Sequence, residues 1–104
     1  MAQFDVFENL NTETNQVVPY LLDVQADLLD TFSTHVVVPL VAASAMGNAV
    51  KHLNPEFKIR NAAVFMSTAE LAGIPVRSLG EKVSSLIDRR HEIMAALDFL
   101  FTGF

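Results

Sequence analysis

VSSLIDRRHEIMAALDFLFTGF, residues 83–104, is the stretch that decides the fold of this chain. Apolar residues recur in it every three or four positions, which is the stripe of an amphipathic helix. The stripe consists of Val83, Leu86, Ile87, Met94, Leu97, Phe101 and Phe104. Ser85, three residues before Asp88, is the candidate N-cap. We therefore expect one long helix that continues to the last residue.

The end of this helix is the first candidate binding surface. Residues 99–104 hold three of the eight Phe residues, and no polar tail follows them. The helical period places three residues on the packed side of the helix, namely Leu97, Leu100 and Phe101. It places three others on the outward side, namely Asp98, Phe99 and Thr102. An outward aromatic beside an apolar end favours a protein-binding face.

Upstream of the helix, the sequence predicts short strands separated by turns. The expected strands cover residues 3–8, 17–24, 34–41, 56–59, 62–67 and 74–79. Phe4 and Val6 should point inward from the first, and Pro19 indicates an edge or a bulge in the second. A polar loop, residues 9–16, joins these two strands. Strands followed by one long helix indicate an α+β fold in a single domain, residues 1–104.

Composition restricts the classes of function. The chain has 104 residues, 51% of them apolar and 18% charged, and this apolar excess favours a partner such as a second copy. A net charge of −5 argues against sequence-independent nucleic-acid binding. The absence of Cys excludes disulfides and thiolate sites. No signal peptide or membrane-spanning run is visible, so we expect a cytoplasmic protein without membrane association.

The polar residues suggest no catalytic, cofactor or metal site. Asp23, Asp27 and Asp30 match no metal loop and are expected to be solvated turn carboxylates. The three His residues lie far apart, and no nucleophile elbow or phosphate-cradling glycine loop is present. The basic cluster at residues 89–91 is expected to be a solvated helix face that pairs with Asp88 or Glu92. What stands out instead is apolar: the Leu28-Leu29 pair between carboxylates, Phe99 and the terminal Phe104.

Six segments, taken in their order along the chain, form a pattern that spans its whole length, although none of them is specific alone. They are Met1-Ala2-Gln3-Phe4-Asp5-Val6, Leu22-Asp23-Val24-Gln25-Ala26-Asp27-Leu28-Leu29-Asp30-Thr31, Val37-Val38-Pro39-Leu40, Ile74-Pro75-Val76, Leu79-Gly80-Glu81 and Ala96-Leu97-Asp98-Phe99-Leu100-Phe101-Thr102-Gly103-Phe104. This ordered set resembles the CcdB family, the toxins of a toxin–antitoxin pair.

The resemblance implies a small antiparallel sheet of the SH3-like barrel type, a minor sheet and a packed C-terminal helix. It also implies a homodimer that poisons DNA gyrase without catalysis, by binding the GyrA subunit across the dimer axis and trapping cleaved DNA. A disordered segment of a CcdA-like antitoxin would wrap the toxin and release gyrase. The polar loop at residues 9–16 is a candidate contact for that antitoxin, and an ordinary solvated hairpin loop is the alternative.

The family's gyrase contacts carry over residue by residue. Its apolar pair falls on Leu28 and Leu29, and its polar residue one turn before the helix end falls on Asp98. The closing Trp-Gly-Ile of the best-known member falls on Thr102, Gly103 and Phe104. Thr102 cannot stack on an Arg as a Trp would. We expect Phe99 and Phe104 to supply aromatic surface instead, with Asp98 pairing with a basic GyrA residue.

Two other functions remain open at this stage. MazF-type endoribonuclease toxins share this fold family, but seven Lys and Arg residues against twelve acidic ones argue against an RNA-cutting groove. A non-toxic interaction module of the same fold is the other alternative, and Thr102 in place of Trp favours it.

Overall fold

A computed structural model describes residues 1–103 of the chain. Its strands are β1 (Asp5–Asn9), β2 (Tyr20–Asp23), β3 (Thr34–Ala42), β4 (Glu56–Ile59), β5 (Ala62–Met66), β6 (Ala72–Pro75) and β7 (Leu79–Ser85). Short 3₁₀ helices form at η1 (Asp27–Leu29), η2 (Thr68–Glu70), η3 (Val76–Ser78) and η4 (Ile87–Arg89). The α-helix α1 covers Arg90–Thr102 and comes last. The expected α+β class is confirmed.

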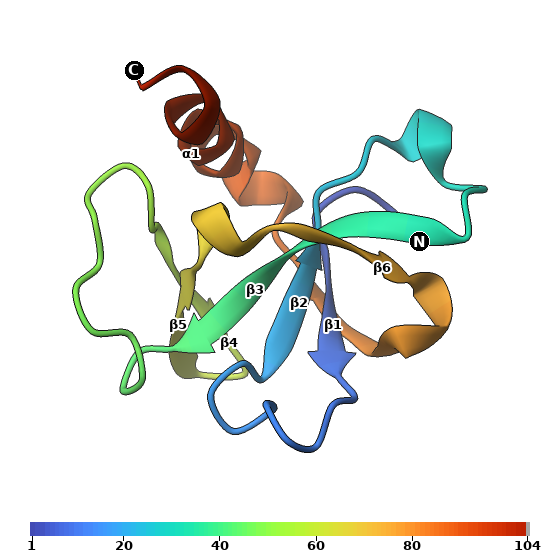
Figure 1. Cartoon of the computed structure of the whole chain (residues 1–104), viewed down its shortest axis with the longest axis horizontal. Helices are drawn as coiled ribbons and strands as arrows, with labels where there is room; N and C mark the ends of the chain where they lie inside the picture. Colours follow the sequence, from blue (N-terminus) through green and yellow to red (C-terminus); the bar gives the residue numbers. More distant parts are fainter. Residues whose placement is uncertain (104) are drawn as a thin grey trace.

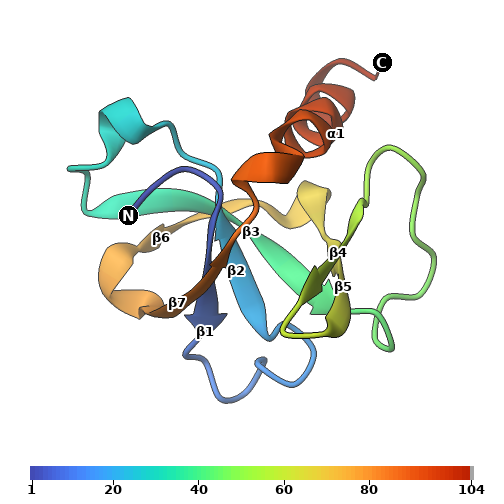
Figure 2. The same cartoon turned by 180° about the vertical axis from the view of Figure 1, so that it is seen from behind.

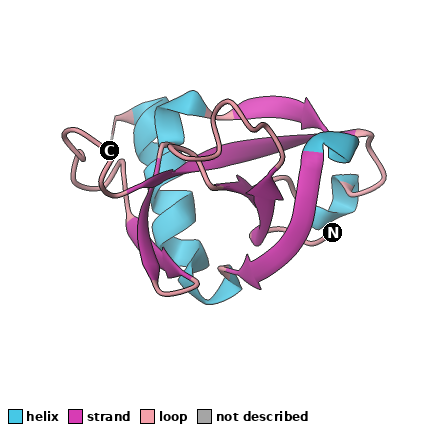
Figure 3. Ribbon diagram, turned by 90° about the horizontal axis from the view of Figure 1, so that it is seen from below, coloured by secondary structure: helices cyan, strands magenta, loops and turns pink. Residues whose placement is uncertain are grey.

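The strands form one curved antiparallel sheet in the order β4-β5-β3-β2-β1-β7 (Figure 1). Strand β3 is its centre, because its nine residues pair with three neighbours. The first half of β3 pairs with β6, the second half pairs with β5, and β2 lies along its other edge. The β4–β5 hairpin thus extends from the end of β3 as the smaller part of the sheet. The strands of the two parts bend around the core (Figure 3).

The core lies between the concave side of this sheet and helix α1. The helix contributes Ile93, Ala96 and Leu97, of which the first two are fully buried. The strands, the turn before β1 and the turn before the helix contribute Phe4, Val6, Leu22, Val38, Leu40, Phe57, Ile59, Val64, Met66 and Leu86. Burying one such large apolar side chain stabilises the fold by about 1.5–3 kcal/mol. Three residues of one short helical face therefore share a single core with the side chains of the sheet.

The expected strands agree with the structure except at the start of the second strand and at the last one. The strand at residues 56–59 has the predicted bounds, and Phe4 and Val6 are buried as predicted. The second strand begins only at Tyr20, after Pro19, so its predicted first three residues belong to the loop. The expected strand at residues 74–79 is wrong, because the chain forms the end of β6 and then η3 there.

The largest correction concerns β7, which sequence periodicity assigned in part to the helix. Val83 lies on β7 and is half-buried there, and Ser85 ends that strand. The Ser85 hydroxyl accepts the Ile87 N–H at 3.3 Å, which stabilises the turn into η4 and not the start of α1. Helix α1 begins at Arg90 without a side-chain cap. Val83 stands four residues before Ile87, a spacing that fits both the two-residue period of a strand and the 3.6-residue period of a helix. The segment forms a strand because it pairs with β1.

The helical stripe is also narrower than predicted. Met94 and Phe101, expected inside, are 42% and 71% exposed, whereas Ile93 and Ala96 are buried. The helix ends at Thr102, because Gly103 adopts a left-handed conformation with φ 79° and donates its N–H to the Phe99 carbonyl at 2.8 Å. The predicted continuation to Phe104 lies outside the described residues.

Gly80 marks the close approach of β7 to β1, and we expect Gly80→Ala to lower the free energy of unfolding by about 1–3 kcal/mol. A Cβ at this position would lie 2.9 Å from both the Cβ and the carbonyl oxygen of Glu8. The strands must then separate or shift in register. Chemical denaturation measures the loss. Gly47→Ala is the control, since no heavy atom lies within 4 Å of a Cβ built there. Equal stability of the two variants would contradict this account of the β1–β7 contact.

Candidate protein-binding surfaces

The first candidate surface is an apolar loop between β2 and β3. It contains η1, in which no residue is buried. Leu28 is 92% exposed and Leu29 is 40% exposed, which confirms that the pair faces solvent. Phe32, 57% exposed, follows on the same loop and was not predicted as a site residue. Three exposed large apolar side chains within five positions are unusual on a surface that has no partner.

A buried polar pair supports the base of this loop. His35 Nδ1 lies 2.8 Å from Asp23 Oδ2, and each side chain is only 1% exposed. The other ring nitrogen of His35 lies 3.3 Å from the carbonyl oxygen of Asp30, which is part of the loop. The expectation that Asp23 is a solvated turn carboxylate is therefore wrong. The sequence did carry a signal for the burial of His35, because this residue stands in the strongly β-branched segment that forms β3.

The pKa of Asp23 reflects this position. Burial raises the pKa of its carboxyl above the ordinary value, because desolvation disfavours the charged form. The Gln25 N–H, which donates to Asp23 Oδ1 at 2.9 Å, and the contact with His35 act in the opposite direction. The charge of Asp5 adds to the upward shift. Asp23 is thus a carboxylate whose buried charge depends on its neighbours.

The other two carboxylates of this segment remain at the surface. Asp27 accepts the Gln3 N–H at 2.6 Å, and Asp30 lies 3.9 Å from the N-terminal ammonium group. Both residues are exposed. The N-terminal segment therefore lies against one flank of the loop, and its polar groups hold the loop near β1.

The second candidate surface is the last turn of α1. Asp98 and Thr102 are exposed as predicted, and the Thr102 hydroxyl donates to the Asp98 carbonyl oxygen at 2.6 Å. Gly103 is exposed beside them. Phe99, predicted to face outward, is half-buried, whereas Phe101 is the exposed aromatic of this turn. Phe104 lies outside the described residues.

One chain does not bring the two surfaces together. In Figures 1 and 2 the loop with η1 and the end of α1 project from the same side of the sheet but at opposite ends of it. The N-terminus lies near the loop. A partner that contacts both surfaces must therefore extend across this side of the molecule, or must meet them on two different chains.

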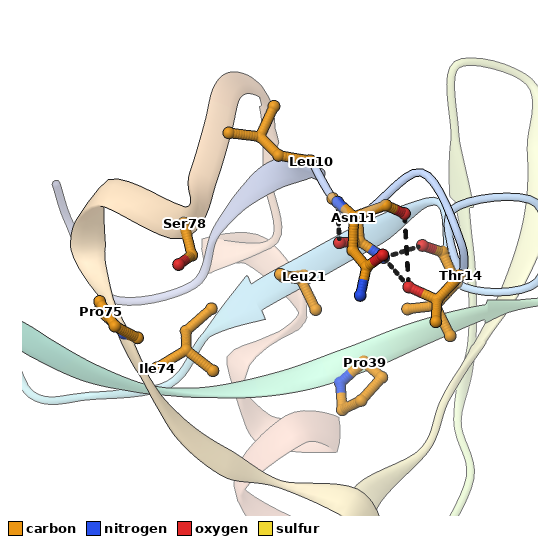
Figure 4. Close-up of a pocket in the computed structure, with 10 residues that line it drawn as sticks. Leu10, Asn11, Thr14, Leu21, Pro39, Ile74, Pro75 and Ser78 are labelled. Carbon is orange, nitrogen blue, oxygen red and sulfur yellow. Dashed lines mark hydrogen bonds between the residues drawn. The ribbon is translucent and has the colours of Figure 1, made fainter.

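A third feature is an apolar pocket next to the polar loop at residues 9–16 (Figure 4). Its volume is about 530 Å³. Leu10 and Leu21 line it from the first two strands and their connection, Pro39 lines it from β3, and Ile74 and Pro75 line it from β6. Leu10 is 54% exposed at its rim. On the polar side, Asn9 donates to Thr14 and to the Val18 carbonyl, which fixes the shape of the loop.

Comparison with family models identifies the chain. The model described as "CcdB protein" matches residues 3–103. The chain belongs to the CcdB family. The match includes both the Leu28-Leu29 loop and the turn at Asp98, Thr102 and Gly103, so both surfaces belong to the family's own fold. CcdB-family membership places the chain among the toxins of toxin–antitoxin systems.

The structure also places the basic cluster and the candidate metal ligands of this CcdB-family chain. Within residues 1–103, no group of three or more His, Asp or Glu side chains could hold a metal ion. The basic cluster pairs as predicted, with Arg89 Nε 2.5 Å from Glu92 Oε1, and Arg89 also lies over the Phe57 ring at 4.8 Å. Over the same described range, no helix is long and apolar enough to cross a membrane.

Proposed function

We propose that this chain is a cytoplasmic toxin that poisons DNA gyrase by protein–protein contact and without catalysis of its own. Its target is the GyrA subunit, and the trapped species is the complex with cleaved DNA. The observation that carries the proposal is the exposure of the Leu28-Leu29 loop, since Leu28 is 92% exposed in a chain of this family. An exposed apolar side chain gains free energy only when a partner covers it.

The turn at the end of α1 supplies the second half of the proposed gyrase surface. Asp98, Thr102 and Gly103 are exposed there, and Asp98 can pair with a basic residue of GyrA. Phe99 and the terminal Phe104 are proposed to contribute aromatic surface in place of the family Trp. Phe99 is half-buried, so only a part of this residue is accessible to a partner.

A homodimer completes this arrangement. The two surfaces lie at opposite ends of one side of a chain, so a two-fold axis can place equivalent surfaces next to each other. The strongly exposed Phe101 and the exposed Met94 on α1 are surface that a second copy would remove from water. Gyrase, which the dimer would contact across this axis, then meets residues of both chains.

A CcdA-like antitoxin is the second proposed partner. The pocket beside the loop at residues 9–16 offers apolar walls from Leu21, Pro39 and Ile74 and a polar rim from Asn11 and Thr14. A disordered segment gains most from such a mixed groove, where apolar anchors and backbone hydrogen bonds alternate. This site is distinct from the Leu28-Leu29 loop, so an antitoxin could bind it while gyrase is still attached.

Induced expression in a gyrase-proficient strain tests the proposal. We expect growth arrest, accumulation of cleaved DNA and capture of GyrA by the purified protein, and co-expression of the antitoxin should relieve the arrest. Degraded cellular RNA with intact DNA would indicate a MazF-type endoribonuclease instead. Normal growth and no capture of GyrA would indicate a non-toxic interaction module, the alternative that Thr102 in place of Trp favours.

A further inference from the structure

The Leu28-Leu29 loop has no hydrophobic anchor of its own. Every residue from Ala26 to Thr34 is exposed, so burial of apolar side chains does not fix its conformation. Within the loop, the N–H groups of Leu29 and Asp30 donate to the carbonyls of Ala26 and Asp27, and Phe32 donates to Leu29. These bonds shape single turns. Two further bonds attach single points of the loop to neighbouring segments, because Ser33 accepts the Val76 N–H at 2.9 Å and Asp27 accepts the Gln3 N–H at 2.6 Å.

The side chain of Gln25 connects more of the loop than either of these bonds, because it reaches the middle of the loop, its end and β3. Its Nε2 donates to the Leu29 carbonyl at 3.0 Å and to the Thr34 carbonyl at 3.3 Å. Its Oε1 accepts the Val36 N–H of β3 at 3.1 Å. Both amide hydrogens and the carbonyl oxygen of Gln25 are thereby used. The amide joins the middle of the loop, its end and the neighbouring strand.

The backbone of Gln25 is itself held by the buried Asp23–His35 pair. Its N–H donates to Asp23 Oδ1, and Asp23 is held by the buried His35. His35 Nε2 reaches the Asp30 carbonyl on the far side of the loop. Besides the bonds at Asp27 and Ser33, the loop is therefore held by side-chain hydrogen bonds that connect it, directly or through Gln25, to the buried Asp23–His35 pair.

We propose that Gln25 is a positioning residue for partner recognition, which holds the backbone of the apolar loop so that Leu28 and Leu29 are presented in a fixed conformation. This inference rests on the proposed gyrase contact for its functional consequence. A loop that is already ordered loses less conformational entropy on binding, so its affinity is higher than that of a mobile loop with the same side chains. Gln25 contributes through the loop and touches the partner through no atom of its own.

The test compares Gln25→Met, which keeps the length of the side chain and removes all three hydrogen bonds, with wild type. We expect amide hydrogen exchange at Leu29, Asp30 and Phe32 to rise about tenfold or more, and affinity for purified GyrA to fall about tenfold. Gln25→Glu is the second variant. It keeps the acceptor for the Val36 N–H but cannot donate to Leu29 and Thr34, so we expect it to behave like Gln25→Met.

Asn54→Leu is the matched control. Asn54 holds the loop between β3 and β4 in a similar manner. Its side chain donates to the Met66 carbonyl at 2.9 Å and accepts the Val50 N–H at 2.8 Å. Its loss should lower thermal stability as much as the loss of Gln25, and should leave both GyrA affinity and exchange in the apolar loop unchanged. An equal loss of GyrA affinity in this control would show a general effect of stability and would overturn the proposal.

The outcomes separate this inference from the proposed function. Unchanged exchange in the loop of both Gln25 variants would overturn the positioning role, whatever the protein binds. Faster exchange with unchanged GyrA affinity would overturn its part in recognition and leave gyrase as the partner. If wild type does not bind GyrA, the proposed function is wrong, and the exchange data alone then decide whether Gln25 orders the loop.

Discussion

Leu28→Asp is expected to abolish growth arrest and to weaken binding of purified GyrA at least a hundredfold. Leu28 is 92% exposed, so its side chain contributes almost nothing to the folded chain, and the variant should fold normally. In the proposed complex the same side chain is covered by GyrA. Its removal forfeits about 2 kcal/mol of apolar burial, and the buried charge adds a desolvation cost of similar size or more. Every 1.4 kcal/mol corresponds to a factor of ten in affinity.

Val50→Asp is the control for this prediction. Val50 is also an exposed apolar residue on a loop, 49% exposed, but it lies between β3 and β4 and is not among the residues of either proposed gyrase surface. It introduces the same charge and should leave arrest and GyrA binding intact. If Leu28→Asp arrests growth as wild type does, the loop is not the gyrase surface. If both variants lose activity, general disruption by an added carboxylate is responsible.

Much of the sheet could be predicted from local pattern alone. The strand at Glu56–Ile59 has alternating buried and exposed residues and Asn54-Pro55 before it, and its predicted bounds are those of β4. The segment from Thr34 is dense in β-branched residues and forms β3, the centre of the sheet. In these segments the local preference and the tertiary pairing favour the same conformation, so the sequence is sufficient.

The stretch at residues 79–85 shows why the rest could not be predicted. Leu79-Gly80-Glu81-Lys82-Val83-Ser84-Ser85 has few apolar residues, so it carries little strand signal of its own. It becomes β7 because it pairs with β1, whose residues stand 70 to 80 positions earlier in the chain. That pairing includes two irregularities in register and an ion pair of 3.3 Å between Lys82 and the buried Asp5. Such contacts have no trace in a local window.

Some features of the candidate surfaces could likewise be predicted from the sequence, and others could not. Exposure of Leu28 and Leu29 was predictable, because the pair stands between carboxylates in a turn-like segment. The exposure of Phe101 was not, since helical periodicity from Val83 set the wrong phase for the stripe. The separation of the loop from the helix end depends on the curvature of the whole sheet. The roles of Gln25 and His35 depend on atoms that meet only after β2 and β3 have paired.

His35→Leu is expected to lower the free energy of unfolding by about 3 kcal/mol at neutral pH, the cost of leaving a buried charge without its partner. The substitution keeps most of the side-chain volume but removes the group 2.8 Å from Asp23, which is itself 1% exposed. Denaturant unfolding measures the loss. His91→Leu is the control, because His91 is exposed on α1 and its substitution should change stability by less than about 0.5 kcal/mol.

The pH dependence of this loss follows from the Asp23 carboxyl. Burial already raises its pKa, and removal of His35 takes away a contact that lowers it, so the pKa rises further in the variant. A group with a raised folded-state pKa contributes stability that is present at low pH and is lost as the pH rises through that pKa. The deficit of His35→Leu should therefore shrink as the pH falls, because the lone carboxyl takes up a proton.

Adding Asp23→Asn to His35→Leu removes the charge at every pH and should recover part of the stability. If the double variant is less stable than His35→Leu by the full cost of Asp23→Asn alone, the two residues do not act as a pair.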